Sequence, residues 1–294
     1  MTMDDFISKI KYNFKQGSIL SKLIYINVGL FLIVRLLSVA FILFNMNADT
    51  VLFWLQVPSS PIQLLYRPWT LLTYMFTHFD FLHIIFNMLW LYWFGGLFLN
   101  FFSERQLGGL YVIGGLAGAL LYIVSYNFFP YFSNVAAHST LMGASASVMA
   151  IVFAVSFYKK DMEISLLLIG RIKLIYLALF TLGIDLLAIT SDNAGGHIAH
   201  IGGALAGILY ASQYHKGKDL TAPFNKIIDF VVNMMRRKPR MKVTHRRTET
   251  DRDYNARKHQ EQEVIDVILD KLKQSGYDSL SDNEKKQLFD ASKK

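Results

Sequence analysis

The sequence predicts an all-α membrane protein, a bundle of six transmembrane helices followed by a helical cytoplasmic tail. The 294 residues are 53% hydrophobic and their mean hydropathy is +0.30, whereas soluble domains use only about 45–50% apolar residues. Several nearly uncharged runs reach or approach the roughly 17–25 residues that an α-helix needs to cross a bilayer. The absence of cysteine excludes disulfides, thiolate metal sites and a cysteine nucleophile.

The six expected spans differ in how many basic residues flank each end. Their ranges are 20–44, 81–100, 107–128, 142–158, 174–190 and 197–214. Lys and Arg collect in short cytoplasmic loops, and here they precede the first span and lie between the second and third and between the fourth and fifth. We therefore expect a multi-pass protein of the inner or plasma membrane, with both termini cytoplasmic and no cleaved signal peptide.

The composition changes abruptly after the last span. We divide the chain into a cytoplasmic N-terminus (1–19), a membrane domain (20–214), an amphipathic and polybasic linker (215–260) and a small helical segment (261–294). Apolar residues in 224–235 recur at helical spacing, which fits a helix on the membrane surface or a soluble amphipathic helix equally well. The basic run 236–247 favours anionic lipid headgroups, by about 1 kcal/mol per charge, over a nucleic acid.

The last segment predicts two short helices that form a hairpin. Ser281 and Glu284 have the spacing of a capping box at the start of the second helix. We expect this hairpin to bind a cytoplasmic partner or to regulate access to the membrane domain.

Polar and ionisable side chains inside the spans are costly to bury in lipid, so each is a functional candidate. These residues are His83, Asn87, Ser145, Ser147, Asp185, His197 and His200. With the N-terminus inside, the second, fourth and sixth spans all enter from the external side. Three separate helices therefore deliver an imidazole and amide, a hydroxyl and a second imidazole to one depth below the outer surface.

The fourth and sixth spans carry small residues at four-residue spacing. Ala146 and Ala150 form such a pair in the fourth span, and Gly203 and Gly207 in the sixth. Small residues let helix backbones approach closely, and a hydrogen bond between Ser145 and His200 requires that approach.

These residue types fit nucleophilic catalysis. A serine hydroxyl becomes nucleophilic when a neighbouring base accepts its proton, and neutral histidine suits that role. The resulting oxyanion needs hydrogen-bond donors, which the backbone N–H of Ser145, the Asn87 amide and the His83 imidazole could supply.

The same residues have other possible roles. A lone serine in a membrane helix often serves packing, and Asn87 could bond neighbouring helices. His197 and His200 could bind a metal with His78, His83 or His138, but no HExxH motif occurs, and we expect no metal. A transporter should show inverted repeats, which are not evident. For Asp185 we favour the wet edge of the fifth span over a role in orienting a histidine.

The motifs resemble those of the rhomboid family over residues 20–214. His83 and Asn87 match its H-x-x-x-N signature, Gly143-Ala144-Ser145 its G-x-S segment, and Ala199-His200 with Gly203 its A-H-x-x-G segment. The resemblance, to the bacterial type with a cytoplasmic extension, implies a six-helix intramembrane serine protease with a Ser-His dyad and no third carboxylate. It implies Ser145 as nucleophile, His200 as base, His83 and Asn87 in the oxyanion hole, transmembrane proteins as substrates and no cofactor.

Three positions depart from the family pattern. Ala146 stands where glycine is common, and Met149 replaces an aromatic residue that often stacks on the catalytic imidazole. In the first external loop Trp69 is not followed by arginine, and the nearest one is Arg67. We expect Gly143, Met149 and Gly203 to support the site. The alternative is a catalytically inactive rhomboid-like protein that binds membrane proteins for transport or quality control.

Overall fold

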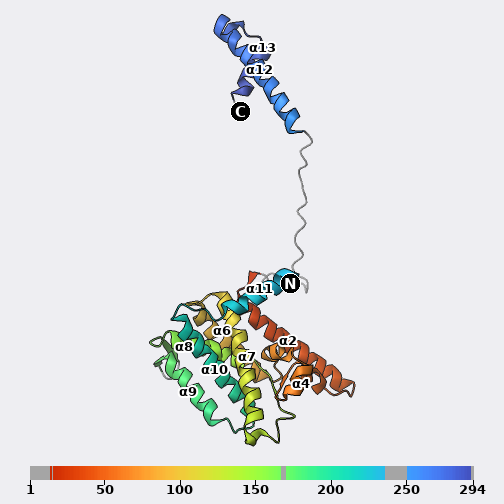
Figure 1. The fold of residues 1–294 in the computed structure, drawn as a ribbon, viewed down its shortest axis with the longest axis vertical. Helices are drawn as coiled ribbons and strands as arrows, with labels where there is room; N and C mark the ends of the chain where they lie inside the picture. Colours follow the sequence, from red (N-terminus) through yellow and green to blue (C-terminus); the bar gives the residue numbers. More distant parts are fainter. Residues whose placement is uncertain (1–13, 15, 167–169, 236–249, 293–294) are drawn as a thin grey trace. The chain divides into compact units, whose positions relative to one another are not determined.

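The computed structural model describes residues 14, 16–166, 170–235 and 250–292. The chain divides into two compact units, Met1–Met235 and Arg236–Lys294 (Figure 1). The basic run 236–247 lies outside the described residues. Its predicted contact with lipid therefore stays a prediction.

Every predicted span falls on a helix of the first unit. Within the described residues, α2 (Ile19–Leu43), α6 (Phe81–Leu99) and α7 (Glu104–Phe128) are long and apolar enough to cross a membrane. The other spans correspond to α8 (Ser145–Tyr158), α9 (Leu174–Leu187) and α10 (Ala194–Tyr214). Because α8 and α9 are shorter apolar helices, the count of six spans stays a prediction.

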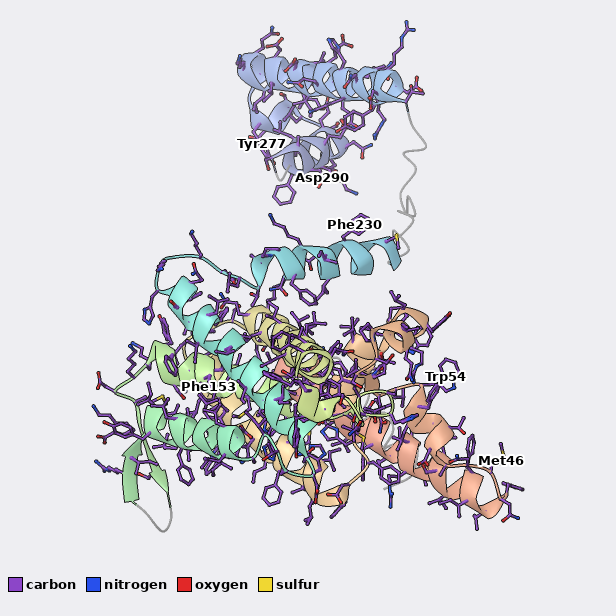
Figure 2. All side chains as sticks on the ribbon, turned by 60° about the horizontal axis from the view of Figure 1, so that its bottom comes forward. Met46, Trp54, Phe153, Phe230, Tyr277 and Asp290 are labelled. Carbon is purple, nitrogen blue, oxygen red and sulfur yellow. The ribbon has the colours of Figure 1, made fainter. Side chains whose placement is uncertain are left out.

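Helix α8 forms the centre of the bundle. It packs against α6, α7, α9 and α10, and all of its residues from Ala146 to Ser156 are buried. Figure 2 shows the side chain of Phe153 inside the bundle, where none of its surface is exposed. The site at the start of α8 therefore rests on the most enclosed element of the fold.

Backbone contact between α8 and α10 is unusually close. A Cβ atom placed on Gly203 would lie 2.0 Å from the carbonyl oxygen of Ala146, and one on Gly207 would lie 2.2 Å from that of Ala150. The predicted packing of small residues between the fourth and sixth spans is thereby confirmed. The methyl group of Ala146 is also accommodated, since it faces Gly118 of α7, where a Cβ would be only 2.5 Å away.

Polar contacts join α2 and α7 inside the bundle. The buried Asn27 amide donates to the Tyr111 hydroxyl at 3.1 Å, and that hydroxyl donates to the carbonyl of Met75 at 2.7 Å. Buried polar groups need such partners. The sequence reading missed Asn27, which lies in a long apolar run and has no local motif around it.

The connection between α2 and α6 is a folded loop with short elements. These are α3 (Asp49–Phe53), β1 (Val57–Pro58), α4 (Pro61–Tyr66), α5 (Thr70–Thr73) and η1 (Tyr74–Phe76). Strand β1 pairs antiparallel with β2 (Thr140–Leu141), close before α8. This pairing ties the first loop to the segment that leads to Ser145.

Aromatic and cationic side chains order this loop. Arg67 is buried, and its guanidinium lies 3.7 Å from the centre of the Phe53 ring. Trp54 and Trp69 stack with ring centres 6.0 Å apart. Arg35 of α2, which has no evident partner in the sequence, lies over Phe79 at 4.5 Å. The arginines thus bind aromatic faces through cation–π interactions.

The all-α prediction needs one further exception besides β1 and β2. Between α8 and α9 the chain forms a two-stranded antiparallel hairpin, β3 (Glu163–Leu166) and β4 (Gly170–Lys173). A short 3-10 helix, η2 (Pro130–Phe132), follows α7. All of these elements are connections, and the core is helical.

Helix α11 (Ala222–Met235) confirms the helix predicted at 224–235 and belongs to the first unit. It is fixed to the start of α7: Arg105 pairs with Asp229 at 3.0 Å, and the Asn225 amide donates to the carbonyl of Arg105 at 3.2 Å. Phe230 projects away from the bundle (Figure 2) and is 69% exposed.

The second unit is a hairpin of α12 (Asp251–Ser275) and α13 (Asp282–Ala291), joined by η3 (Tyr277–Ser279). The predicted capping box of Ser281 and Glu284 is confirmed. The start predicted for the first helix, at 261, is wrong: Thr250 caps α12 by accepting from the N–H of Asp253. A threonine followed by acidic residues is a strong helix start.

Candidate active site

Helix α8 begins at Ser145, and the loop before it is held on both sides. The N–H of Gly143 donates to the carbonyl of Tyr74 at 2.9 Å, and the N–H of Ala144 donates to Nε2 of His78 at 3.2 Å. Burial, with a contribution from His83 nearby, lowers the pKa of His78 to about 4, so this ring is neutral and can accept. The first N–H groups of a helix have no helical acceptor, so Ser145 presents a free backbone donor beside its hydroxyl.

Position 143 requires glycine for two reasons, its backbone conformation and the lack of room for a Cβ atom. Its φ of +120° lies in a region that residues with a Cβ rarely adopt. A Cβ there would lie 2.7 Å from Cε1 of His83. The imidazole of His83 thus packs directly on the backbone that precedes Ser145.

Helix α6 supplies His83 and Asn87 from one face, as the spacing of four residues predicts. The N–H of His83 donates to the capping carboxylate of Asp80 at 2.8 Å. The Asn87 amide is buried and donates one hydrogen to the carbonyl of His83 at 2.9 Å. The second amide hydrogen remains to serve another acceptor.

Asp185 corrects the sequence reading. It is 5% exposed, so placing it at a wet edge was wrong. Its Oδ1 atom lies 2.9 Å from Nδ1 of His200 and 2.8 Å from Nδ1 of His197. A buried carboxylate requires such partners, and α10 supplies both from histidines three residues apart. The resemblance implied no third carboxylate, yet one contacts the imidazole of His200.

The same cluster could in principle ligate a metal, because Asp185, His197 and His200 each offer an atom within 4.8 Å of the others. Two ligands of a tetrahedral zinc with bonds of about 2.0–2.1 Å are separated by about 3.3 Å. Both carboxylate–imidazole distances are shorter, 2.8 and 2.9 Å. They are hydrogen-bond distances, and the residues as they stand favour a hydrogen-bonded cluster over a metal site.

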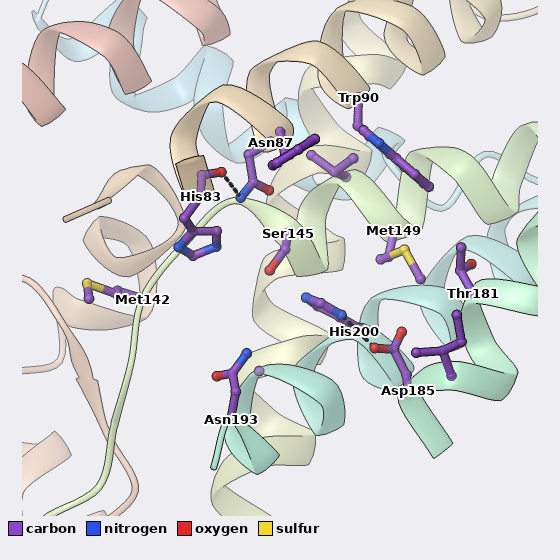
Figure 3. Close-up of a pocket in the computed structure, with 14 residues that line it drawn as sticks. His83, Asn87, Trp90, Met142, Ser145, Met149, Thr181, Asp185, Asn193 and His200 are labelled. Carbon is purple, nitrogen blue, oxygen red and sulfur yellow. Dashed lines mark hydrogen bonds and ion pairs between the residues drawn. The ribbon is translucent and has the colours of Figure 1, made fainter. Parts of the chain in front are cut away.

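All four predicted reacting residues line one pocket, of about 350 Å³. Ser145, His200, His83 and Asn87 come from three helices, and Met149 and Asp185 complete the wall on the α9 side. Figure 3 shows the ring of His200 between Ser145 and Asp185. Phe86, Trp90, Val148 and Ile184 add an apolar part to the wall, and Thr181 and Asn193 are further polar residues in it.

No hydrogen bond between Ser145 and His200 is present among the described residues. Catalytic hydrogen bonds are often long without substrate and shorten in the complex. Met149 lies in the pocket wall beside Thr181 (Figure 3). The bond that holds the ring of His200 is the one to Asp185.

The family model of the Rhomboid domain matches residues 66–217, more than half of the chain. The chain belongs to the rhomboid family. The matched region contains α6 to α10 and therefore every residue of the pocket. This rhomboid domain is mostly helical and carries the apolar helices of a membrane protein.

Curated relatives of the rhomboid domain include mitochondrial and bacterial proteins. "RHOMBOID-like protein 12, mitochondrial" of Arabidopsis thaliana is 29% identical over 51% of this chain and 47% of its own length. "Presenilin-associated rhomboid-like protein, mitochondrial" of Homo sapiens is 29% identical over 48% of this chain and 36% of its own length. "Rhomboid protease GlpG" of Salmonella choleraesuis (strain SC-B67) is 36% identical over 25% of each chain. The match thus spans less than half of each relative.

The C-terminal hairpin matches a second family model, a family of unknown function (DUF6576), over residues 248–294. This range begins just before α12 and includes both helices of the hairpin. The match agrees with the start of α12 at Asp251 better than with the boundary expected at 261.

Two site residues were not assigned by sequence reasoning. His78 was considered only as a metal ligand, and its contact with the N–H of Ala144 depends on a loop conformation that no spacing rule predicts. Asp185 was recognised as unusual because it is a carboxylate in an apolar run. Whether the Asp185 side chain points into the bundle depends on how α9 is rotated about its axis. The apolar composition of α9 does not predict that rotation.

Proposed function

We propose that this rhomboid protein is an intramembrane serine endopeptidase that cleaves transmembrane proteins. The observation that carries the proposal is the pocket that Ser145 shares with His200, His83 and Asn87. A hydroxyl at a helix start, a neutral base and a set of donors are what acyl transfer requires.

The proposed reaction has two steps. Oγ of Ser145 bonds to the substrate carbonyl carbon while its proton passes to Nε2 of His200; the C–N bond then breaks, and Nε2 gives the proton to the leaving nitrogen. In the second step water bonds to the acyl carbon and loses a proton to Nε2, and Oγ leaves and regains that proton. No metal or cofactor takes part.

Donors near the hydroxyl stabilise the oxyanion in both steps. The free amide hydrogen of Asn87, the imidazole of His83 and the backbone N–H of Ser145 all lie at the start of α8 or on the facing side of α6. Preorganised donors of this kind are worth about 10²–10³ in rate for each one removed.

The substrate class follows from the surroundings of the pocket. Its walls include Phe86, Trp90 and Ile184, which suit an apolar segment better than a charged peptide. We propose that the protein is multi-pass with both termini cytoplasmic. The pocket then lies near the outer membrane face, and the enzyme cleaves a substrate helix close to its outer end.

Cleavage of a purified transmembrane substrate in detergent or liposomes tests this function. Ser145→Ala and His200→Ala should each abolish cleavage. Ser147→Ala is the matched control: Ser147 is buried two residues further along α8 but faces Gly115 of α7, where a Cβ would lie 2.8 Å from its hydroxyl. The control should cleave at nearly the wild-type rate. Undiminished cleavage by Ser145→Ala would remove the proposal.

The alternative is a catalytically inactive protein that binds membrane proteins. The retained Ser145 and His200 favour the enzyme. Binding of the substrate without cleavage by the wild-type protein, under conditions where a known serine protease is active, would favour the alternative.

We also propose that α11 lies on the membrane surface. Ile227, Phe230 and Met234 are at least 60% exposed, and a helix with such a face binds the interface between headgroups and acyl chains. The basic residues that follow would contact anionic lipid. Flotation with anionic and with neutral vesicles tests this: replacing Phe230 and Met234 by serine should weaken the association of a 215–260 fragment, and unchanged flotation would contradict the proposal.

A further inference from the structure

Asp185 is a carboxylate within an apolar stretch of α9. Its neighbours Ile184, Leu186 and Leu187 are apolar, and each is exposed by about half or more, as expected for a helix surface that faces lipid. Asp185 instead turns inward, where only 5% of its surface remains exposed. An ionised carboxylate in this location is costly unless it is hydrogen-bonded, and Asp185 bonds to two imidazoles.

The bond to His200 fixes which nitrogen carries the proton. A carboxylate accepts hydrogen bonds, so Nδ1 of His200 must be the donor and Nε2 the free lone pair. Figure 3 shows the ring lying between the two side chains, with Asp185 on one side and Ser145 on the other. The lone pair is therefore directed to the side on which a serine proton has to be accepted.

The bond to His197 does not give that histidine the same task. His200 is part of the pocket wall with Ser145, whereas His197 is not among the residues that line it. The rings of the two histidines are centred 5.9 Å apart and nearly perpendicular. His197 thus contacts the same carboxylate oxygen, Oδ1, from outside the pocket and supplies it with a second donor.

We propose that Asp185 is a positioning residue that holds His200 in the reactive tautomer, so that the site works as a Ser145–His200–Asp185 triad. The inference rests on the proposed function. The Asp185 carboxylate on α9 orients the imidazole of His200. Met149, on the α8 side of the pocket, has a flexible side chain and gives the imidazole no rigid surface to pack on. In addition, the carboxylate stabilises the imidazolium that forms during each proton transfer.

The proposal predicts a specific kinetic signature in the full-length protein. Asp185→Asn keeps the size of the side chain but allows the amide to donate to Nδ1, which favours the wrong tautomer. We expect kcat to fall at least about 100-fold, in line with the effect of such a change in serine proteases, with KM within about threefold. Labelling of Ser145 by a fluorophosphonate should slow in parallel, and Asp185→Glu should retain more activity than Asp185→Asn.

Two controls separate this role from a structural one. Asp192→Asn makes the same chemical change at an exposed site before α10 and should leave kcat unchanged. His197→Ala removes the second donor but leaves the bond to His200 and should keep kcat within about threefold. A thermal unfolding midpoint for each variant identifies any loss that is due to misfolding.

The outcomes are distinct. Cleavage by Asp185→Asn at a rate within threefold of wild type, while Ser145→Ala is inactive, would overturn the triad and leave the protease. An equal loss in His197→Ala and Asp185→Asn, with lowered unfolding midpoints, would show that the cluster only stabilises the fold. Cleavage by Ser145→Ala would instead overturn the proposed function itself.

Discussion

Gly203 of α10 lies against the backbone carbonyl of Ala146 on α8, one residue after the predicted nucleophile. A Cβ atom on residue 203 would lie 2.0 Å from that oxygen, which is closer than real Cβ atoms come to a neighbouring atom. This contact sets the distance between the helix that carries Ser145 and the helix that carries His200.

Gly203→Ala should therefore destabilise the bundle and lower activity. The added methyl cannot be accommodated without moving α8 and α10 apart, and overpacking of a core costs typically about 1–3 kcal/mol. Thermal unfolding and cleavage measure the two effects. Gly96→Ala on α6 is the control, because nothing lies within 4 Å of its Cβ position; it should be neutral or slightly stabilising through helix propensity. A stable, fully active Gly203→Ala would contradict the observed packing.

Gly143→Ala should impair catalysis more than folding. It places a Cβ 2.7 Å from the ring of His83 and imposes a positive φ on a residue that disfavours it, at a cost of about 1–3 kcal/mol. We expect a loss of at least about tenfold in kcat from displacement of Ser145 and His83. Gly217→Ala shares the positive φ, here +74°, but has open space around it. If both variants lose activity equally, the contact with His83 is not the cause.

The sequence predicts most of the site because its residues belong to spans that enter from one side. Ser145, His200, His83 and Asn87 could be placed at one depth by counting from the ends of the spans, and small residues predicted the contact of α8 with α10. The direction of Asp185 could not be predicted, since it depends on the rotation of α9 against α10. The contact of Ala146 with Gly118 brings together residues of different helices, and no local pattern encodes it.

The fold was predictable to a similar degree. Apolar length indicated the helices but not all of their ends: α8 begins at Ser145 and not at 142, and α9 ends at Leu187 and not at 190. The pairing of β1 with β2 joins residues more than eighty positions apart, and its strands of two residues carry no periodicity. The burial of Asn27 was not predictable either, since its partner Tyr111 is 84 positions away, and that of Arg67 depends on the conformation of the loop that brings Phe53 to it.

Removal of metal ions should not change the reaction. The carboxylate and the two imidazoles of the Asp185 cluster lie at hydrogen-bond distances of 2.8 and 2.9 Å, shorter than the separation of about 3.3 Å between two ligands of a tetrahedral zinc ion. Cleavage rates after dialysis against EDTA should stay within about twofold of the untreated rate. Loss of activity that added zinc restores, but magnesium does not, would assign the cluster to a metal.

The C-terminal hairpin should lose stability in acid through Glu284. The backbone N–H of Ser281, the ammonium of Lys271 and the hydroxyl of Ser281 bond its carboxylate and lower its pKa from 4.5 to about 2. Because the folded state has the lower pKa, this stabilisation is complete above about pH 4.5 and is lost as the pH falls through about 2. Circular dichroism of a 248–294 fragment should show helix loss across this window.

Glu284→Gln provides the comparison for this pH dependence. Glutamine keeps the geometry of a capping box but does not titrate, so the variant should show a weaker dependence on pH between 4.5 and 2. Asp290→Asn, at an exposed position on the same helix, should behave as the wild type. Identical acid titrations of Glu284→Gln and the wild-type fragment would rule out the capping carboxylate as the cause.

Covalent modification by a fluorophosphonate identifies the nucleophile directly. The full-length protein in detergent is labelled, digested and mapped by mass spectrometry. We predict one modified residue, Ser145, with labelling that disappears in His200→Ala and persists in Ser147→Ala. Modification of a different serine, or cleavage of a transmembrane substrate by protein whose Ser145 is fully blocked, would contradict it.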